Sequence, residues 1–347
     1  MASARGYAVM SPKAELVPFT FERRELRAAD VEITITHAGI CHSDIHQGRE
    51  EWGAALFPMV PGHEIVGRVQ SVGSAVTKFV PGQLVGVGVF IDSCRKCENC
   101  RSGLEQYCSE GMTGTYNTLE RDGKTMAYGG YSNLIVVDQN YVVSVPENIP
   151  VEGVAPLMCA GITLYSPLRH WQTAPGKKIG IIGLGGLGHM GVKFAHAMGA
   201  HVTVFSHSER KKSDALAMGA NDFIANASAD YFKKNGSTFD LILNTVSVDV
   251  NLEEYLSLLR LDGTLVLIGL PGKPYQVPAG VLLGKRRRLA GSMIGGVAEL
   301  QEMLDFCGDK NITSDVELIS PDYINKAWER TVASDVKYRF VIDAAKF

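Results

Sequence analysis

The sequence predicts an α/β protein of two domains, in which a β-rich domain is interrupted by a doubly wound parallel sheet. Three observations support this fold class. The chain has 347 residues, which exceeds the length at which one hydrophobic core usually keeps growing. The first ~150 residues contain segments in which apolar and polar residues alternate, the period of half-buried strands. After Pro156, strand and helix patterns follow each other in turn, which is typical of a parallel sheet with helices on both faces.

Strand patterns dominate the first part of the chain. Val31–Thr36 reads V-E-I-T-I-T, and Ile65–Gly73 and Leu84–Phe90 are β-rich segments between Pro-Gly turns. The loops around these segments hold five of the seven cysteines and four of the nine histidines. Because functional residues are often carried by loops on a rigid scaffold, we expect the chemistry to lie on this domain.

The central part has the alternating pattern. Its strands are expected at Lys178–Gly183, His201–Phe205, Asp240–Val246 and Thr264–Leu270, and its helices at Gly188–Ala200 and Arg210–Ala220. After Gly296 the pattern is helical, and Tyr338–Asp343 is a short β-like segment that is expected to return to the first domain. We therefore expect residues 1–160 and 296–347 in the β-rich domain and 161–295 in the inserted domain.

The composition is typical of a globular protein without a strongly charged partner. Hydrophobic residues make up 46% and charged residues 20%, and the formal net charge of -3 does not indicate a nucleic acid or membrane partner. The basic run Lys285–Arg288 is interpreted as a solvated face. No apolar run approaches the ~18 residues of a membrane span, and the N-terminus lacks the apolar core of a signal peptide. The cytoplasm is the expected location.

Four of the seven cysteines fall within fifteen residues: Cys94, Cys97, Cys100 and Cys108 are separated by two, two and seven residues. This spacing lets one loop surround a zinc ion tetrahedrally, which predicts a closed, structural site. Two alternatives are four reduced cysteines without metal and an iron-sulfur cluster, since four thiolates alone do not identify the metal. A reducing compartment favours metal over disulfides. Cys307 is expected to be a buried small hydrophobe.

A catalytic zinc site needs three protein ligands and an open position. Cys41 and His63 are two candidates, and Cys159 is the candidate third, although a lone cysteine in this position is also compatible with a core residue. Glu64 could coordinate when the open position is otherwise empty, and Asp44 could accept a hydrogen bond from His63. Because Cys159 directly precedes the inserted domain, we expect the site to close only when the two domains meet.

The segment from Gly183 to Gly188 reads G-L-G-G-L-G and matches the G-x-G-x-x-G pattern of dinucleotide binding. It follows a predicted strand and opens a predicted helix, the context in which a pyrophosphate can approach the helix N-terminus. A glycine-rich turn without ligand is the alternative. About 20 residues further on, where NAD enzymes place a carboxylate, the chain has hydroxyls and cations, which favour a 2'-phosphate and hence NADP over NAD. These residues are Ser206, His207, Ser208, Arg210, Lys211 and Lys212; Glu209 is expected to face water.

Together these motifs resemble the zinc-dependent alcohol dehydrogenases of the medium-chain dehydrogenase/reductase superfamily, over nearly the whole chain. Within it the chain is similar to the cinnamyl alcohol dehydrogenase group and its NADPH-dependent broad-specificity aldehyde reductases. The motifs are C41-H-S-D-I-H, P61-G-H-E, the four-cysteine loop, C159-A-G-I-T, Y165-S-P-L-R-H-W, G183-L-G-G-L-G-H and G291-S-M-I-G-G. The resemblance implies a GroES-like β domain, a Rossmann domain, two zinc ions, NADP(H), and homodimers or tetramers.

The resemblance also implies roles for individual residues. Cys41, His63 and Cys159 match the catalytic zinc ligands, Glu64 the conditional ligand, and the four-cysteine loop the structural zinc ligands. Ser43 matches the hydroxyl that hydrogen-bonds to the substrate oxygen, and His46 the histidine that passes the proton on through the cofactor ribose. The matching cofactor positions are His42 (pyrophosphate), Thr163 (nicotinamide), Gly183, Gly185, Gly186, Leu187 and Gly188 (glycine loop), Ser206, His207, Ser208 and Lys211 (2'-phosphate), and Ser292 and Ile294.

The expected activity is hydride transfer between NADP(H) and aldehydes or primary alcohols of small-molecule size. Trp52, Met293 and Ile294 suggest an apolar pocket for aromatic or medium-chain aldehydes. One departure from the family is His207, which interrupts a run of serines in plant-type members. The alternatives are an NAD-dependent zinc dehydrogenase for a polyol or a thiol adduct, and a zinc-ribbon nucleic acid module, which the acidic net charge disfavours.

Overall fold

The computed structural model describes residues 2–347, which divide into two compact units. The first unit extends to Ile162 and resumes at Gly295–Phe347, and the second unit is Thr163–Ile294. The chain therefore leaves the first unit once and returns to it once. This is the arrangement expected for a domain inserted into another domain.

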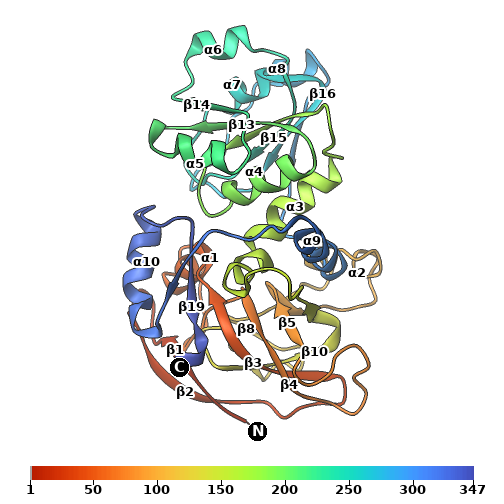
Figure 1. Cartoon of the computed structure of the whole chain (residues 1–347), viewed down its shortest axis with the longest axis vertical. Helices are drawn as coiled ribbons and strands as arrows, with labels where there is room; N and C mark the ends of the chain where they lie inside the picture. The colour runs from red at the N-terminus through yellow and green to blue at the C-terminus, as the bar shows by residue number, and fades with distance from the viewer. Residues whose placement is uncertain (1) are drawn as a thin grey trace. The chain divides into compact units, whose positions relative to one another are not determined.

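The first unit is built on a mixed sheet with strand order β11-β5-β4-β3-β19-β18, with β10 also paired to β3 (Figure 1). The strands of this sheet are β3 (Asp30–Gly39), β4 (Ile65–Val72), β5 (Leu84–Val87), β10 (Leu134–Asp138), β11 (Val143–Ser144), β18 (Val316–Ile319) and β19 (Arg339–Asp343). Smaller antiparallel pairs are β1 (Ala2–Val9) with β2 (Leu16–Arg23), β6 (Phe90–Asp92) with β7 (Thr113–Gly114), and β8 (Thr118–Leu119) with β9 (Met126–Ala127).

The alternation of apolar and polar residues in β3 places its apolar side chains on the buried face. Val31, Ile33 and Ile35 are buried, while the residues between them are more exposed, because successive side chains of a strand point to opposite faces. The predicted return of the C-terminal segment is confirmed, since β19 pairs antiparallel with the end of β3. The predicted strand Leu84–Phe90 is instead two strands, because β5 pairs with β4 whereas β6 leaves the sheet to pair with β7.

Four helices of the first unit are α1 (His42–Gly48), α2 (Glu98–Arg101), α9 (Val297–Lys310) and α10 (Ile324–Val332). Helix α9 ends at Asn311, whose φ of 54° places it in the left-handed region that often terminates helices. Side chains from α1 and α10 share one core cluster with the sheet, including Ile45, Trp328 and Ile342. The C-terminal segment is thus part of the core on which the functional residues of this unit rest.

The second unit contains a parallel sheet with strand order β14-β13-β12-β15-β16-β17. Its strands are β12 (Lys178–Ile182), β13 (His201–Ser206), β14 (Asp222–Ala225), β15 (Phe239–Asn244), β16 (Leu259–Leu267) and β17 (Arg288–Gly291). In order of sequence this is 3-2-1-4-5-6, the doubly wound order with its switch point between the first and fourth strands. The predicted fold class is confirmed. The two central strands, β12 and β15, are buried almost throughout, as expected for strands covered on two faces.

The helices of this part of the chain are α3 (Ala160–His170), which spans the boundary between the units, α4 (Gly188–Ala197), α5 (Lys212–Ala217), α6 (Ala229–Lys234), α7 (Leu252–Ser257) and α8 (Ala279–Leu283). The helix predicted at Arg210–Ala220 begins instead as a 3-10 turn, Glu209–Lys211, before α5. Aromatic side chains such as Phe205 and Phe239 form the core of this unit with Leu256.

In the described part of the chain no single helix is long and apolar enough to cross a membrane; by length and composition alone, one bent pair, Val151–Met158 with Ala160–His170, passes that test.

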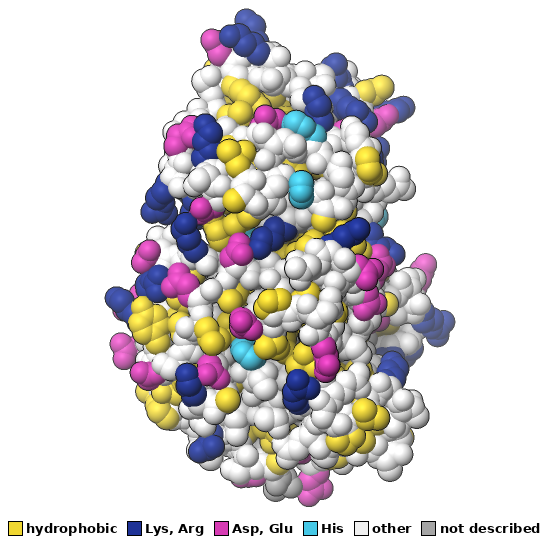
Figure 2. All heavy atoms as spheres, viewed as in Figure 1, with side chains coloured by type: hydrophobic (Ala, Val, Ile, Leu, Met, Phe, Trp, Pro, Cys, Tyr) yellow, Lys and Arg dark blue, Asp and Glu magenta, His cyan; other side chains and the backbone are white. Residues whose placement is uncertain are grey.

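On the face seen in Figure 2, Lys and Arg side chains are interspersed with Asp and Glu. This distribution agrees with the small net charge of -3. It gives that face no continuous basic surface of the kind that binds nucleic acid.

Candidate metal centres and dinucleotide site

Four potential ligands meet in the first unit. Cys41 directly precedes α1, His63 and Glu64 directly precede β4, and Cys159 directly precedes α3. Their ligand atoms lie within 4.8 Å of one another, and all four residues are buried. All four belong to the first unit, so the expectation that the site closes only when the two domains meet is wrong. Cys159 lies in the first unit because the boundary between the two units comes later in the sequence, after Ile162.

The geometry of this cluster fits a zinc ion. The Sγ atoms of Cys41 and Cys159 are 4.0 Å apart, close to the ~3.8 Å that follows from tetrahedral geometry with Zn–S bonds of about 2.3 Å. Nδ1 of His63 lies 3.3 Å from Oδ1 of Asp44. Its Nε2 is buried and has no hydrogen-bond partner in residues 2–347. A buried nitrogen without a partner beside two thiols is suited to a metal.

The charges around the cluster favour a positive charge between its side chains. The hydrogen bond with the Cys159 thiol holds the pKa of Cys41 well below its usual range, against the effect of burial. Burial lowers the pKa of His63, but the charges and hydrogen bonds of Asp44 and Cys41 together outweigh it, so that this pKa is raised. A cation is therefore favoured between the imidazole and the thiols. Thiolate and neutral imidazole are the forms that bind metal, so zinc would take the place of that proton.

Glu64 forms a fully buried ion pair that the sequence analysis did not anticipate. Its Oε1 accepts a hydrogen bond from Nη2 of Arg339, which also donates to the carbonyl of Ile40 over 2.7 Å. Burial raises the pKa of Glu64 to about 8 even though the Arg339 charge opposes the shift. Its Oε2 has no hydrogen-bond partner among the described residues. A carboxylate oxygen is thus left available beside the cluster, as a conditional ligand requires.

Asp44 organises the two segments that carry the first ligands. At the third position of α1, its Oδ2 accepts the backbone N–H of Cys41 over 2.9 Å, as the third residue of a capping box does. Its Oδ1 accepts the N–H of Gly62 over 3.1 Å and faces the His63 ring. Tyr131 donates its hydroxyl to Oδ2 over 3.1 Å. Asp44 therefore lies where the sequence analysis expected an orienting residue.

The proton-relay candidates lie on α1. The thiol of Cys41 is 3.5 Å from the Ser43 hydroxyl, which places Ser43 at the edge of the metal cluster. His46, one turn further on, is half-buried, hydrogen-bonds to Glu51 through Nδ1, and stacks on Trp52 with ring centroids 4.7 Å apart. Glu51 fixes the ring, and neither it nor this stacking was expected from the sequence.

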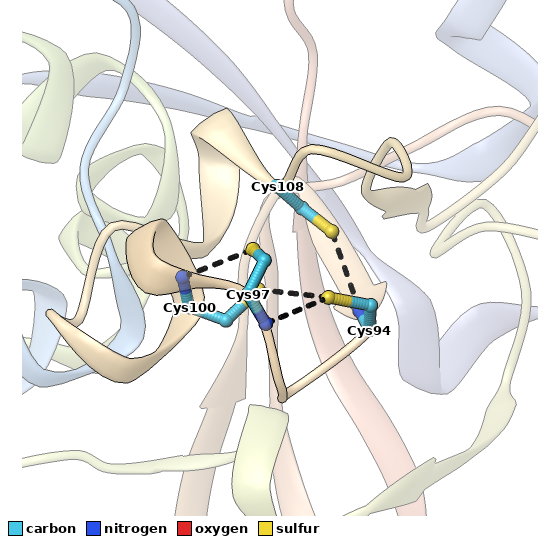
Figure 3. Close-up of side chains that lie close together, drawn as sticks. All are labelled: Cys94, Cys97, Cys100 and Cys108. Carbon is cyan, nitrogen blue, oxygen red and sulfur yellow. Dashed lines mark hydrogen bonds between the residues drawn. The ribbon is translucent and has the colours of Figure 1, made fainter.

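The four-cysteine loop forms the second cluster (Figure 3). The Sγ atoms of its four residues lie within 4.8 Å of one another, and those of Cys94 and Cys100 are 3.8 Å apart. Backbone amides point at the sulfurs: the N–H groups of Cys94 and Cys97 donate to Cys108 and Cys94 over 3.3 Å. Hydrogen bonds from the Cys100 and Ser109 amides are the main reason that the pKa of Cys97 is lowered to about 5. The arrangement fits a closed zinc shell with four thiolates.

The glycine loop of the second unit has room for a ligand where one is expected. Gly183, at the end of β12, has a φ of 91°, which side-chain-bearing residues rarely adopt. A Cβ on Gly188 would lie 2.0 Å from the Gly183 carbonyl, so that glycine is needed for close packing. A Cβ on Gly185 would meet no atom within 4 Å. The loop thus presents open backbone at the start of α4 and at the switch point of the sheet, which fits a dinucleotide.

The residues after β13 approach this loop. Lys211 donates from Nζ to the carbonyl of Leu184, inside the glycine loop, over 2.8 Å. The Ser206 hydroxyl accepts the N–H of Ser208 over 3.4 Å. Glu209 is exposed and pairs with Lys212 over 3.3 Å, as the expectation that it faces water requires. The Lys211 cation therefore lies beside the loop, and His207 is exposed.

The remaining predicted positions are distributed over both units. His42 is an exposed residue of α1, whereas Thr163 is buried in α3. Ser292 and Ile294 follow β17, and Ile294 is buried with a φ of 40°, an unusual value for a β-branched residue. Trp52 and Met293 are 46% and 43% exposed, so both present apolar surface to solvent.

Comparison with known proteins places this geometry in a family. Residues 27–147 match the family "Alcohol dehydrogenase GroES-like domain", and residues 186–309 match "Zinc-binding dehydrogenase". The chain is 56% identical over 346 residues to NADP-dependent alcohol dehydrogenase C 1 of Mycolicibacterium smegmatis, covering 99% of both chains.

Two solved structures have the same fold over almost their whole length. A cinnamyl alcohol dehydrogenase of Sorghum bicolor gives a TM-score of 0.95 with 45% identity, covering 99% of this chain and 98% of the other. A cinnamyl alcohol dehydrogenase of Helicobacter pylori complexed with NADP(H) gives 0.93 with 42% identity and 99% coverage of both. The resemblance seen in the sequence is confirmed: this chain belongs to the family of zinc-binding alcohol dehydrogenases.

Proposed function

We propose that this protein is a zinc-dependent oxidoreductase that interconverts aldehydes and primary alcohols with NADP(H). The observation that carries the proposal is the buried cluster of Cys41, His63 and Cys159, with the unpartnered Nε2 of His63 directed to it. Three protein ligands leave the fourth position of a tetrahedral zinc open to a substrate oxygen. The four-cysteine loop, by contrast, offers a full shell and supports a structural zinc.

Each protein group has a task in this chemistry. When bound, zinc supplies Lewis-acid polarisation of the carbonyl and the nicotinamide supplies hydride. Ser43, at the edge of the cluster, hydrogen-bonds to the substrate oxygen and hands on its proton. His46, held by Glu51, is the residue that would exchange that proton with solvent. Glu64 is the conditional ligand: Arg339 holds its Oε1, and its Oε2 has no hydrogen-bond partner among the described residues.

NADP(H) is the proposed cofactor. The open backbone at Gly185 takes the pyrophosphate, and Ser206, Ser208 and Lys211 take the 2'-phosphate. Glu209 does not oppose this assignment, since its carboxylate is engaged by Lys212. The names of the relatives from Mycolicibacterium smegmatis and Helicobacter pylori, one NADP-dependent and the other complexed with NADP(H), support the same cofactor.

The proposed substrates are aromatic or medium-chain aldehydes and the matching alcohols. The exposed apolar side chains of Trp52 and Met293 support this class, as does the cinnamyl alcohol dehydrogenase from Sorghum bicolor. We also propose a cytoplasmic homodimer formed through the second unit. In the described chain β17 is an edge strand of the parallel sheet, and Leu283 of the neighbouring α8 is 81% exposed.

Steady-state kinetics with NADPH and NADH over a panel of aldehydes, alcohols and polyols test the function. We expect aldehyde reduction with NADPH to have the highest kcat/KM. A preference for NADH of tenfold or more would overturn the cofactor assignment, and fast oxidation of polyols would overturn the substrate class.

A matched pair of variants makes the cofactor test specific. Lys211→Ala should raise the KM for NADPH about tenfold with little effect on NADH, because a charge-assisted hydrogen bond to the 2'-phosphate is lost. Lys326→Ala, whose exposed ammonium pairs with Glu329 on α10 of the first unit, should leave both cofactors unaffected. Equal behaviour of the two variants would contradict the role of Lys211.

A further inference from the structure

A chain of hydrogen bonds reaches the metal cluster from the C-terminal helix. The indole N–H of Trp328, on α10, donates to the hydroxyl of Tyr131 over 3.2 Å. Tyr131 in turn donates to Oδ2 of Asp44 over 3.1 Å, and Asp44 faces His63. Tyr131 and Asp44 are fully buried, and Trp328 and His63 are 7% and 2% exposed. The four side chains thus form a continuous buried line that ends at the proposed zinc ligand.

The chemistry of these four side chains determines which group donates and which accepts in each hydrogen bond. Indole N–H is a donor only, so the Tyr131 oxygen must accept it, and the Tyr131 hydrogen is then directed to Asp44. An ionised carboxylate only accepts, so Asp44 takes the Tyr131 hydrogen at Oδ2 and the Nδ1 hydrogen of His63 at Oδ1. This arrangement keeps the hydrogen of the neutral imidazole on Nδ1 and leaves the lone pair on Nε2, the atom directed to the thiols.

The backbone around Asp44 leaves little freedom for a different arrangement. The N–H groups of Cys41 and Gly62 occupy the same carboxylate, so any shift of Asp44 moves the segments that carry both ligands. Tyr131 is itself tied to the second of these segments, because its N–H donates to the Pro61 carbonyl over 2.9 Å. Its ring also lies against Gly62, where an added Cβ would be 2.6 Å from Cδ1.

We propose that Tyr131 and Trp328 are positioning residues of the metal centre, acting through Asp44 on the orientation and tautomer of His63. The inference rests on the proposed function, in that it takes Cys41, His63 and Cys159 to hold the zinc. Two residues of the C-terminal segment thus support the metal centre. Trp328 does so through Tyr131, and Arg339 does so through its pair with Glu64.

The test removes the hydroxyl while keeping the ring. In Tyr131→Phe we expect the zinc of the Cys41 centre to be lost to the chelator 4-(2-pyridylazo)resorcinol about three- to tenfold faster than in the wild-type protein, below the range for a direct partner of a ligating His. The d–d absorption bands of the Co²⁺-substituted centre should shift. Trp328→Phe should change both readouts in the same direction by less, and it carries the test if Tyr131→Phe does not fold.

Tyr141→Phe is the matched control. Tyr141 is also a buried tyrosine of the first unit, but its hydroxyl is bonded to Ser93, beside the four-cysteine loop, over 2.7 Å. It should leave zinc release from the Cys41 centre and the cobalt bands of that centre unchanged. Tyr131→Phe with lower stability but wild-type zinc release and cobalt bands would overturn the inference and assign Tyr131 to packing alone. A wild-type protein without zinc at the Cys41 centre would instead overturn the proposed function.

Discussion

The two cysteine clusters of the first unit have opposite constructions. The four-cysteine loop takes its ligands from fifteen consecutive residues and surrounds its sulfurs with backbone amides. The other cluster joins Cys41 to Cys159, 118 positions apart, and surrounds them with buried charged groups, Asp44 and Arg339. The first cluster is partly exposed, whereas every member of the second is buried.

This difference indicates how structural and catalytic metal sites are supported. A loop whose amides donate to its own sulfurs depends mainly on local geometry, and four thiolates leave no position for a substrate. A site assembled from distant segments depends on the core, and its ligands are oriented by partners that are themselves held by packing. In this chain those partners include residues near the C-terminus, which β19 and α10 bring to the cluster.

The largest effect is expected from Cys159→Ser, which breaks the distributed cluster. Aldehyde reduction should fall by more than about 100-fold, since a direct ligand is lost rather than one of its partners. Zinc content should fall from about two to about one per chain, because the four-cysteine loop is untouched. Elemental analysis and NADPH-dependent kinetics measure both quantities, and an active variant with one zinc would contradict the role of Cys159.

The next largest effect is expected from Arg339→Met, because this variant leaves Glu64 buried without the guanidinium that pairs with it. Breaking a buried ion pair from one side typically lowers the free energy of unfolding by about 3–5 kcal/mol. Urea unfolding measures the change. Lys326→Met is the control, since Lys326 pairs with Glu329 on the surface of α10 and should cause no measurable change. Equal stability of the two variants would show that Arg339 does not stabilise the cluster.

Cys100→Ser tests the local loop and should have a smaller effect on the whole molecule. We expect loss of one zinc and a melting temperature lower by about 5 °C, as expected for a loss of roughly 2 kcal/mol. The Cys41 cluster should keep its zinc, which differential scanning calorimetry with metal analysis can check. Loss of both zinc ions would show that the two clusters are not independent.

The smallest effect is expected from Cys307, which lies outside both clusters and contributes only to the pH dependence of stability. It is fully buried in α9, and burial raises the pKa of its thiol to about 12. The native protein keeps this proton between pH 9 and 12 while the unfolded chain loses it, so this thiol's contribution to stability falls as pH rises through that range. Iodoacetamide at pH 8.5 should label Cys307 only in denaturant, as measured by mass spectrometry; labelling of the native thiol would contradict its burial.

Much of the fold could be predicted because it depends on local patterns. The period of β3 and the alternation of strands and helices after Pro156 identify the two kinds of sheet, and the spacing of Cys94 to Cys108 identifies a metal loop. The pattern Gly183 to Gly188 could be placed because its neighbours along the chain form a strand and a helix. In each of these cases the residues that interact are close in sequence.

The support of the metal cluster could not be predicted in the same way. Arg339, Tyr131 and Trp328 reach the cluster through long-range pairing and core packing, which no local period encodes. One signal was present: an arginine precedes the apolar run F-V-I of β19, where a charge is costly unless it is paired. The expectation that the site closes only when the two domains meet was wrong for a related reason, because sequence order does not show whether a ligand beside a domain boundary packs within its own domain or against the other.

The most direct test of the catalytic centre follows zinc content and aldehyde reduction together while a chelator removes metal from the wild-type protein. We predict that activity disappears in step with one of two zinc ions per chain, and that Cys100→Ser retains the activity-linked zinc. Re-addition of Zn²⁺ should restore activity. Undiminished reduction of aldehydes by protein from which both zinc ions have been removed would contradict the assignment of Cys41, His63 and Cys159 as the catalytic centre.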